Sequence, residues 1–176
     1  MIKPVRIRHV RLDPEIAGKL FLHSMPGRYE PLDTFLAEAH GHEVDLVVCL
    51  AAEDELVRLS PDYAFRTQTG TFPVERNTYV IKDYGFPTDM PAFLAFTDEL
   101  ARSLHAGRRV LIHCAAGIGR TGLTAASVLM QLGYPLKEAI ETIEKAGSHP
   151  EIGAQGIFLR KFEARRAESS ADSANP

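Results

Sequence analysis

The segment Arg109-Val-Leu-Ile-His-Cys-Ala-Ala-Gly-Ile-Gly-Arg-Thr-Gly122 joins an apolar run to a glycine-rich loop. The run 110–112 shows no alternation of polar and apolar residues, which is typical of a strand covered on both faces. The residues after the loop, 120–132, are predicted to form a helix that ends before Gly133. A strand that passes through a loop directly into a helix indicates an α/β fold.

The rest of the chain alternates in the same way between short β-branched segments and longer helical ones. We expect strands at 5–10, 19–22, 44–50, 78–81 and 109–113, and helices at 31–40, 53–59, 91–105, 120–132, 135–146 and 152–166. Prolines stand at expected helix starts and glycines at expected helix ends: Pro31, Pro91 and Pro135, and Gly107, Gly133 and Gly147. The pattern predicts one α/β domain with a central mixed sheet of about four or five strands flanked by helices.

Length and charge limit the possible functions. The chain has 176 residues, which suits a single domain. From residue 167 on, no apolar side chain is larger than alanine, so we expect a folded domain at 1–166 and a disordered tail at 167–176. The net charge of -3 argues against a broad basic surface for nucleic acid or an anionic membrane. Any bound anion must therefore be held at a local site.

Cysteine content and hydropathy bear on the compartment. Two cysteines, Cys49 and Cys114, are too few for a disulfide scaffold, so a reducing compartment is expected. No apolar run approaches the roughly 20 residues that span a bilayer, and the N-terminus lacks the apolar segment of a signal peptide. We expect a cytoplasmic monomer without membrane insertion.

The loop itself has the composition of an anion site. Cys114 follows the strand, and small residues let successive backbone N–H groups point into one concavity at the start of a helix. The N–H groups would come from Ala115, Ala116, Gly117, Ile118 and Gly119. They and Arg120 would favour the Cys114 thiolate, which is the nucleophilic form, and the Arg120 guanidinium matches two oxygens of a phosphate. The residues therefore describe a cysteine nucleophile and an oxyanion cradle in one loop.

Other interpretations of this loop fit less well. Gly117-x-Gly119-x-x-Gly122 matches a dinucleotide-binding fingerprint, but that site needs a second strand ending in an acidic residue about 20 positions later. Here 134–146 is predicted to be helical. No lysine follows the glycines, which argues against a nucleotide triphosphatase loop. Cys114 could also be an ordinary buried cysteine, but its spacing from Arg120 argues for function.

His113-Cys-x5-Arg-Thr resembles the signature of the cysteine-dependent protein tyrosine and dual-specificity phosphatases. Segments 24–28, 47–50 and 83–89 are similar to the compact branch that includes the Cdc14-like and kinase-associated phosphatases. The resemblance implies a dual-specificity phosphatase-like fold over 1–166. It also implies hydrolysis of a phosphomonoester through a phosphocysteine intermediate at Cys114, without a metal or another cofactor.

The leaving group of such a reaction must be protonated by an acid, which members of this family supply from a loop before the signature. Asp83 opens a loop rich in Gly and Pro and is our candidate, whereas Asp89 resembles a helix N-cap. By resemblance, Thr121 assists departure of the cysteine and His113 fixes the loop and favours the thiolate. Gln155 matches loosely the glutamine that orients water in many members.

The substrate remains open at this level. Relatives that act on inositol phosphates often place basic residues between the cysteine and the arginine, and no lysine lies between Cys114 and Arg120. The resemblance therefore favours a phosphorylated protein over a phosphoinositide or nucleotide. A catalytically idle phosphate-binding module on the same fold is the competing hypothesis. Cys49 is predicted to lie in the core, with oxidation to a disulfide with Cys114 as an alternative seen in some relatives. His40 and His42 are assigned to a solvated loop rather than to a metal site.

Overall fold

The computed structural model describes residues 6–151 and 153–173. Within them, five strands form one sheet in the order β1-β2-β5-β3-β4. Their bounds are β1 Arg8–Val10, β2 Lys19–His23, β3 Leu46–Cys49, β4 Glu75–Thr78 and β5 Arg109–His113. β1 is antiparallel to β2 and the other pairs are parallel, so the sheet is mixed, as predicted. β5 lies at the centre, and its last residue, His113, is level with His23 of β2 and Cys49 of β3.

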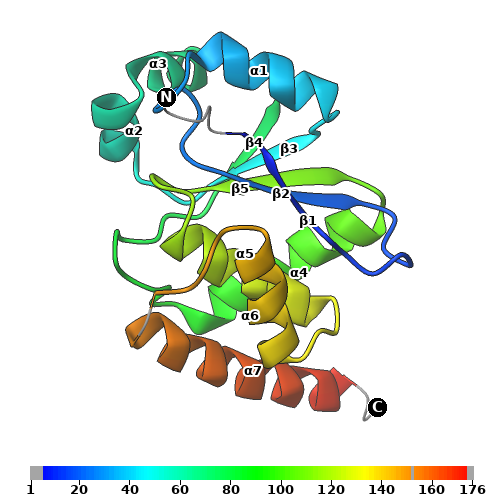
Figure 1. Ribbon diagram of the computed structural model, residues 1–176. Helices are drawn as coiled ribbons and strands as arrows, with labels where there is room; N and C mark the ends of the chain where they lie inside the picture. Colours follow the sequence, from blue (N-terminus) through cyan, green and yellow to red (C-terminus); the bar gives the residue numbers. More distant parts are fainter. Residues whose placement is uncertain (1–5, 152, 174–176) are drawn as a thin grey trace.

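Helices cover both faces of the sheet (Figure 1). One face carries α1 Leu32–Gly41, α2 Glu53–Leu59 and α3 Pro61–Gln68. The other carries α4 Met90–His105, α5 Gly119–Gln131, α6 Leu136–Lys145 and α7 Ala154–Ser173. Along β5, Val110 and Ile112 enter the core beneath α4 to α7, whereas Leu111 enters the core beneath α1 to α3. This double coverage explains the unbroken apolar run, and it confirms the predicted α/β class.

Several elements differ from the sequence-based prediction. The fourth strand is Glu75–Thr78, although 79–81 still runs beside β3, with Tyr79 N donating to Cys49 O at 3.0 Å. Because β4 is an edge strand, its polar residues do not show the apolar pattern that the prediction relied on. Helix α3 was not predicted. It starts at a proline directly after α2, and its buried Tyr63 and Ala64 secure it to the core. The first strand begins at Arg8, and residues 1–5 lie outside the described part.

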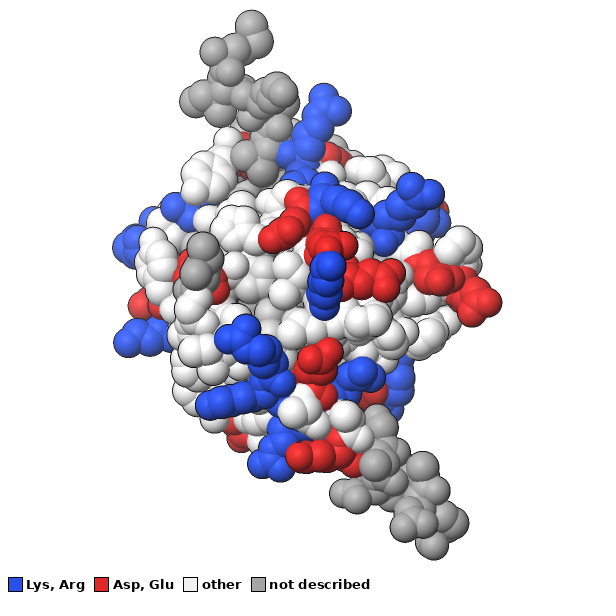
Figure 2. Space-filling view, turned by 60° about the horizontal axis from the view of Figure 1, so that its bottom comes forward, with Lys and Arg blue, Asp and Glu red and all other residues white. Residues whose placement is uncertain are grey.

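The C-terminal helix is longer than predicted. α7 continues through 167–173, the segment assigned to a tail, so a lack of large apolar residues did not end the helix. Residues 174–176 lie outside the described part, and the boundary at 166 stays a prediction. In the described ranges no helix is long and apolar enough to cross a membrane. Basic and acidic side chains are interspersed on the face turned forward in Figure 2, in keeping with the small net charge.

Candidate active site

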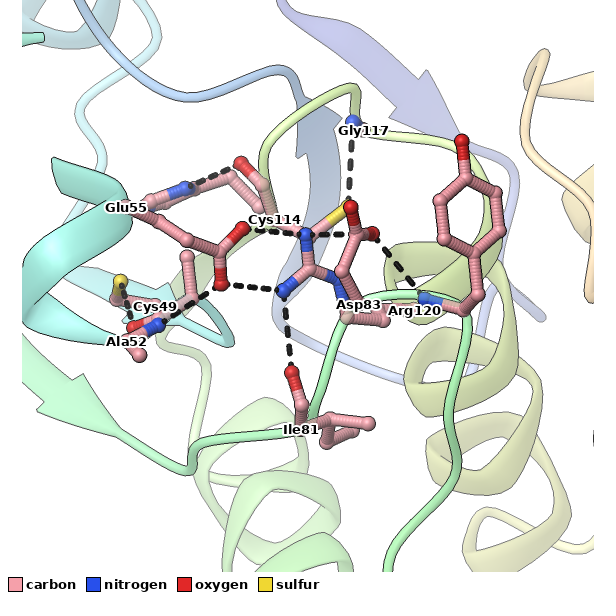
Figure 3. Close-up of polar contacts among 11 residues, drawn as sticks. Cys49, Ala52, Glu55, Ile81, Asp83, Cys114, Gly117 and Arg120 are labelled. Atoms are coloured by element: carbon pink, nitrogen blue, oxygen red, sulfur yellow. Dashed lines mark hydrogen bonds and ion pairs between the residues drawn. The ribbon is translucent and has the colours of Figure 1, made fainter. Parts of the chain in front are cut away.

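The loop after β5 lies at the carboxyl ends of three parallel strands, where α/β sheets commonly bind ligands. Cys114 is 2% exposed, and Gly117 N donates a hydrogen bond to Cys114 Sγ at 3.3 Å (Figure 3). α5 begins at Gly119, so the positive end of its helix dipole lies at the loop that carries Cys114. The loop therefore combines a sulfur atom, a backbone donor and a helix N-terminus, as the sequence predicted.

Two glycines of the loop are required by close backbone contacts. Gly117 has φ +73°, and a Cβ there would lie 2.3 Å from the carbonyl oxygen of His23. A Cβ on Gly122 would lie 2.5 Å from the backbone carbon of His149. Since real Cβ contacts are not this short, any larger residue would move the loop or α5. Gly117 and Gly122 are thus needed for the packing of the loop and of α5 against the neighbouring backbone.

Arg120 is held by a carboxylate that the sequence did not reveal. Its Nη1 and Nη2 donate to the two carboxylate oxygens of Glu55 at 2.8 and 2.9 Å, and Nη1 also donates to Ile81 O at 3.0 Å (Figure 3). Hydrogen bonds from Arg120 hold the pKa of Glu55 below its ordinary value. The Arg120 side chain is 2% exposed. The guanidinium is thereby fixed in one plane at the loop.

Glu55 lies in the first turn of α2, which follows the carboxyl end of β3. Its Oε2 also accepts a hydrogen bond from Ala52 N at 3.2 Å, so the side chain caps its own helix while it binds Arg120. The sequence signal that could have pointed to Glu55 is an acidic residue in the first turn of a helix that follows a central strand. Its exposed neighbours Glu53 and Asp54 carry the same signal, and only the fold shows which of the three binds Arg120.

The structure places the two candidate acids differently. Asp83 Oδ1 lies 3.0 Å from Arg120 Nη2, and the Asp83 side chain is 56% exposed. Tyr84 N donates to Asp83 Oδ1 at 3.2 Å, and Tyr84 has φ +57°. Asp89 instead accepts from Ala92 N at 2.9 Å as the N-cap of α4, as its sequence context predicted. Of the two, Asp83 is the one brought to the loop.

His113 is fully buried at the end of β5. Its Nδ1 lies 3.1 Å from the carbonyl oxygen of Cys114, and its Nε2 lies 3.0 Å from the hydroxyl of Tyr63. Burial lowers the pKa of His113 to about 4, so the ring is neutral at pH 7. A neutral imidazole in this position fixes the backbone of Cys114. Tyr63, on the unpredicted helix α3, is its second partner.

The remaining predicted residues surround the loop. The Thr121 hydroxyl is buried and has no hydrogen-bond partner among the described residues. Both ends of the Gln155 amide are engaged: its Oε1 accepts from Glu151 N at 2.6 Å and its Nε2 donates to Gly85 O at 2.8 Å. Gln155 therefore joins the start of α7 to the loop that carries Asp83.

Cys49 is a core residue, in agreement with its apolar surroundings in the sequence. It is buried at the end of β3, and burial raises the pKa of its thiol. Both Cys49 and Cys114 are free thiols. Among the described residues, no three His, Cys, Asp or Glu side chains come together as metal ligands, and this includes His40 and His42.

A mixed sheet covered by helices on both faces, with a Cys-x5-Arg loop between its central strand and a helix, defines the class of cysteine-dependent dual-specificity phosphatases. The chain belongs to the family described as "Polymorphic toxin system, DSP-PTPase phosphatase", whose model matches residues 23–134. This match confirms the resemblance seen in the sequence. No curated protein matches the chain significantly.

Solved structures share this fold over nearly the whole chain. Kinase associated phosphatase, crystallised with its catalytic cysteine changed to serine, has a TM-score of 0.79 at 22% identity, with 95% of this chain and 98% of that one covered. The active form of Tk-PTP has a TM-score of 0.67 at 26% identity, with 90% and 97% covered. PTPMT1 has a TM-score of 0.70 at 23% identity, with 94% and 99% covered.

Proposed function

We propose that this protein hydrolyses phosphomonoesters, with Cys114 as the nucleophile and a phosphocysteine intermediate. The observation that carries the proposal is the buried Cys114 Sγ in a loop whose Arg120 is fixed by Glu55 and contacts Asp83. A candidate nucleophile, an oxyanion site and a candidate acid thus lie at the loop and at the start of α5. Membership of a phosphatase family supports the same reaction class.

In the first step, the Cys114 thiolate attacks phosphorus and the bond from phosphorus to the leaving oxygen breaks. Backbone N–H groups of the loop and the Arg120 guanidinium receive the three remaining phosphate oxygens, whose charge grows in the transition state. Asp83, whose side chain is 56% exposed beside Arg120, donates its proton to that oxygen. The products are a free alcohol or phenol and phosphocysteine.

In the second step, water attacks phosphorus, the sulfur–phosphorus bond breaks, and Asp83 accepts a proton from the water. The unpartnered Thr121 hydroxyl is available to hydrogen-bond the departing sulfur. Gln155 holds the loop that carries Asp83 through its hydrogen bond to Gly85 O, and so helps Asp83 to face the water. If Gln155 releases that bond, its amide can orient the water directly. Phosphate then leaves and the thiolate is restored.

The rim of the site favours a phosphorylated protein, with aryl phosphates among its substrates. Tyr84 and Phe86, beside Asp83, are 79% and 42% exposed and offer aromatic surface to a substrate ring or chain. Three carboxylates surround the loop, those of Glu55, Asp83 and Glu151, the last lying where a Cβ on Gly119 would be. Together they oppose a substrate with several phosphates.

A phosphoinositide is the second candidate substrate, because one similar structure is PTPMT1 in complex with PI(5)P, at 23% identity. The two substrate classes are separated by comparing kcat/KM for phosphotyrosine and phosphothreonine peptides, a nucleotide and soluble phosphoinositides. We expect phosphotyrosine peptides to lead. A phosphoinositide with the highest kcat/KM would reassign the substrate while leaving the reaction class intact.

Turnover of p-nitrophenyl phosphate in the presence of EDTA tests the reaction itself. We expect it to persist in the intact protein and to be lost in Cys114→Ser. No turnover by the intact protein, with phosphate still bound, would favour the idle binding module.

The acid is tested by Asp83→Asn, with Asp89→Asn as the matched control. Asp83→Asn should lower kcat about 10²- to 10⁴-fold, the usual contribution of general acid catalysis, and leave binding of inorganic phosphate nearly unchanged. Asp89→Asn keeps a side-chain oxygen that can accept from Ala92 N, so it should preserve the cap of α4 and leave kcat within a few fold. The reverse result would assign the acid to Asp89.

A further inference from the structure

The carbonyl oxygen of Gly117 is held from behind by two donors that lie far from it in the sequence. Arg8 Nη2 donates to it at 2.7 Å and Ser148 Oγ at 2.6 Å. Arg8 Nη1 in turn donates to Ser148 Oγ at 3.0 Å and to the carbonyl oxygen of Gly147. Arg8 belongs to the edge strand β1, and Ser148 follows α6. Two separate elements therefore converge on one peptide group of the loop.

This contact fixes the direction of the next N–H group. In a trans peptide the C=O of Gly117 and the N–H of Ile118 point in opposite directions. With the carbonyl drawn back towards Arg8, the Ile118 N–H is turned to the opposite side, the side of the phosphate concavity. No hydrogen bond from Ile118 N is found within the described residues. The N–H is thus free for an oxyanion, and the two bonds to the carbonyl polarise it further.

Charge adds a second argument. The positive charge of Arg120 is matched by Glu55 and by Asp83. Arg8, in contrast, forms no ion pair with any described residue, and its partners are carbonyl and hydroxyl oxygens. Burial lowers the pKa of the Arg8 guanidinium, and the nearby Cys114 opposes that effect. Within the described part of the chain, Arg8 is therefore a cation beside the loop whose charge is not already neutralised by a carboxylate.

We propose that Arg8, held by Ser148, is a positioning residue that orients the Gly117–Ile118 peptide and supplies uncompensated positive charge behind the phosphate cradle. The inference rests on the proposed function, since it assigns a role in the same site. It predicts that Arg8 acts on phosphate binding and on kcat without touching the substrate.

Arg8→Met tests this, with Arg11→Met as the control that removes an equal charge from an exposed position of the same segment. We expect Arg8→Met to raise the Kd of inorganic phosphate about tenfold, the effect of losing a charge-assisted hydrogen bond. Calorimetry measures this Kd. kcat for p-nitrophenyl phosphate should fall by at least as much. Arg11→Met should change neither quantity more than twofold.

Two further variants separate geometry and charge from a loss of folding. Arg8→Lys keeps the charge but not the planar fork, so it should recover part of the phosphate affinity. Ser148→Ala removes one of the two donors and should weaken phosphate binding about threefold with little change in Tm. The proposal is overturned if Ser148→Ala binds phosphate as tightly as the intact protein does, and if a folded Arg8→Met or Arg8→Lys does so too. Because phosphate binding does not require turnover, an inactive protein would refute the proposed function alone.

Discussion

Replacing Glu55 by glutamine tests how the phosphate-binding arginine is held. Both carboxylate oxygens of Glu55 accept from Arg120, at 2.8 and 2.9 Å, and the two side chains are 12% and 2% exposed. Glutamine keeps the volume and one acceptor, but its amide nitrogen cannot accept the second bond. A hydrogen bond to a charged group contributes about 1.5–3 kcal/mol, so we expect a loss of about 2 kcal/mol in the free energy of unfolding.

For a domain of this size, that loss corresponds to a fall in Tm of about 4–8 °C. If the same 2 kcal/mol is lost from the transition state, kcat/KM falls about 30-fold. Thermal unfolding and steady-state kinetics with p-nitrophenyl phosphate measure the two effects. Asp54→Asn, one residue earlier and exposed, is the control and should show neither. A Glu55→Gln protein with the Tm and kcat/KM of Asp54→Asn would refute the role given to this contact.

Two further predictions concern the packing behind the loop. Burial lowers the pKa values of His23 and His113 from 6.5 to about 4, so the unfolded chain binds protons that the folded protein does not. Stability should therefore fall between pH 7 and pH 5, by about 2 kcal/mol per histidine, in urea unfolding. His23→Gln should remove half of this fall, whereas the control His40→Gln, at an exposed position, should remove none of it. Equal pH dependence in the intact protein and both variants would contradict the assignment. Gly117→Ala should destabilise by at least about 3 kcal/mol, because the new Cβ would lie 2.3 Å from His23 O. Gly70→Ala has a similar positive φ and open space, so it should cost only about 1–2 kcal/mol, and equal costs would show that the contact is absent.

The centre of the fold and the loop were predictable because their signals are local. Val110 to Ile112 are buried on both faces of the sheet, and an unbroken apolar run records that environment directly. Cys114 lies in the loop and Arg120 in the first turn of α5 directly after it, so their spacing alone indicated an oxyanion site. Proline and glycine marked most helix boundaries, since each acts through its own backbone conformation.

The partners of the loop were not predictable, because they come from segments that meet only in the folded chain. Glu55 is 65 residues from Arg120, and Arg8 is 109 residues from Gly117. Each looks like an ordinary surface charge in the sequence. β4 was misplaced because an edge strand can be polar. α3 was missed because a short helix depends on tertiary packing rather than on its own propensity.

Trapping the covalent intermediate tests the central claim most directly. The protein would be mixed with a radiolabelled phosphotyrosine peptide, quenched in acid during turnover, digested and analysed by mass spectrometry. The proposed mechanism predicts phosphate bonded to the sulfur of Cys114. Turnover with no label on Cys114, or with the label on another residue, would contradict it.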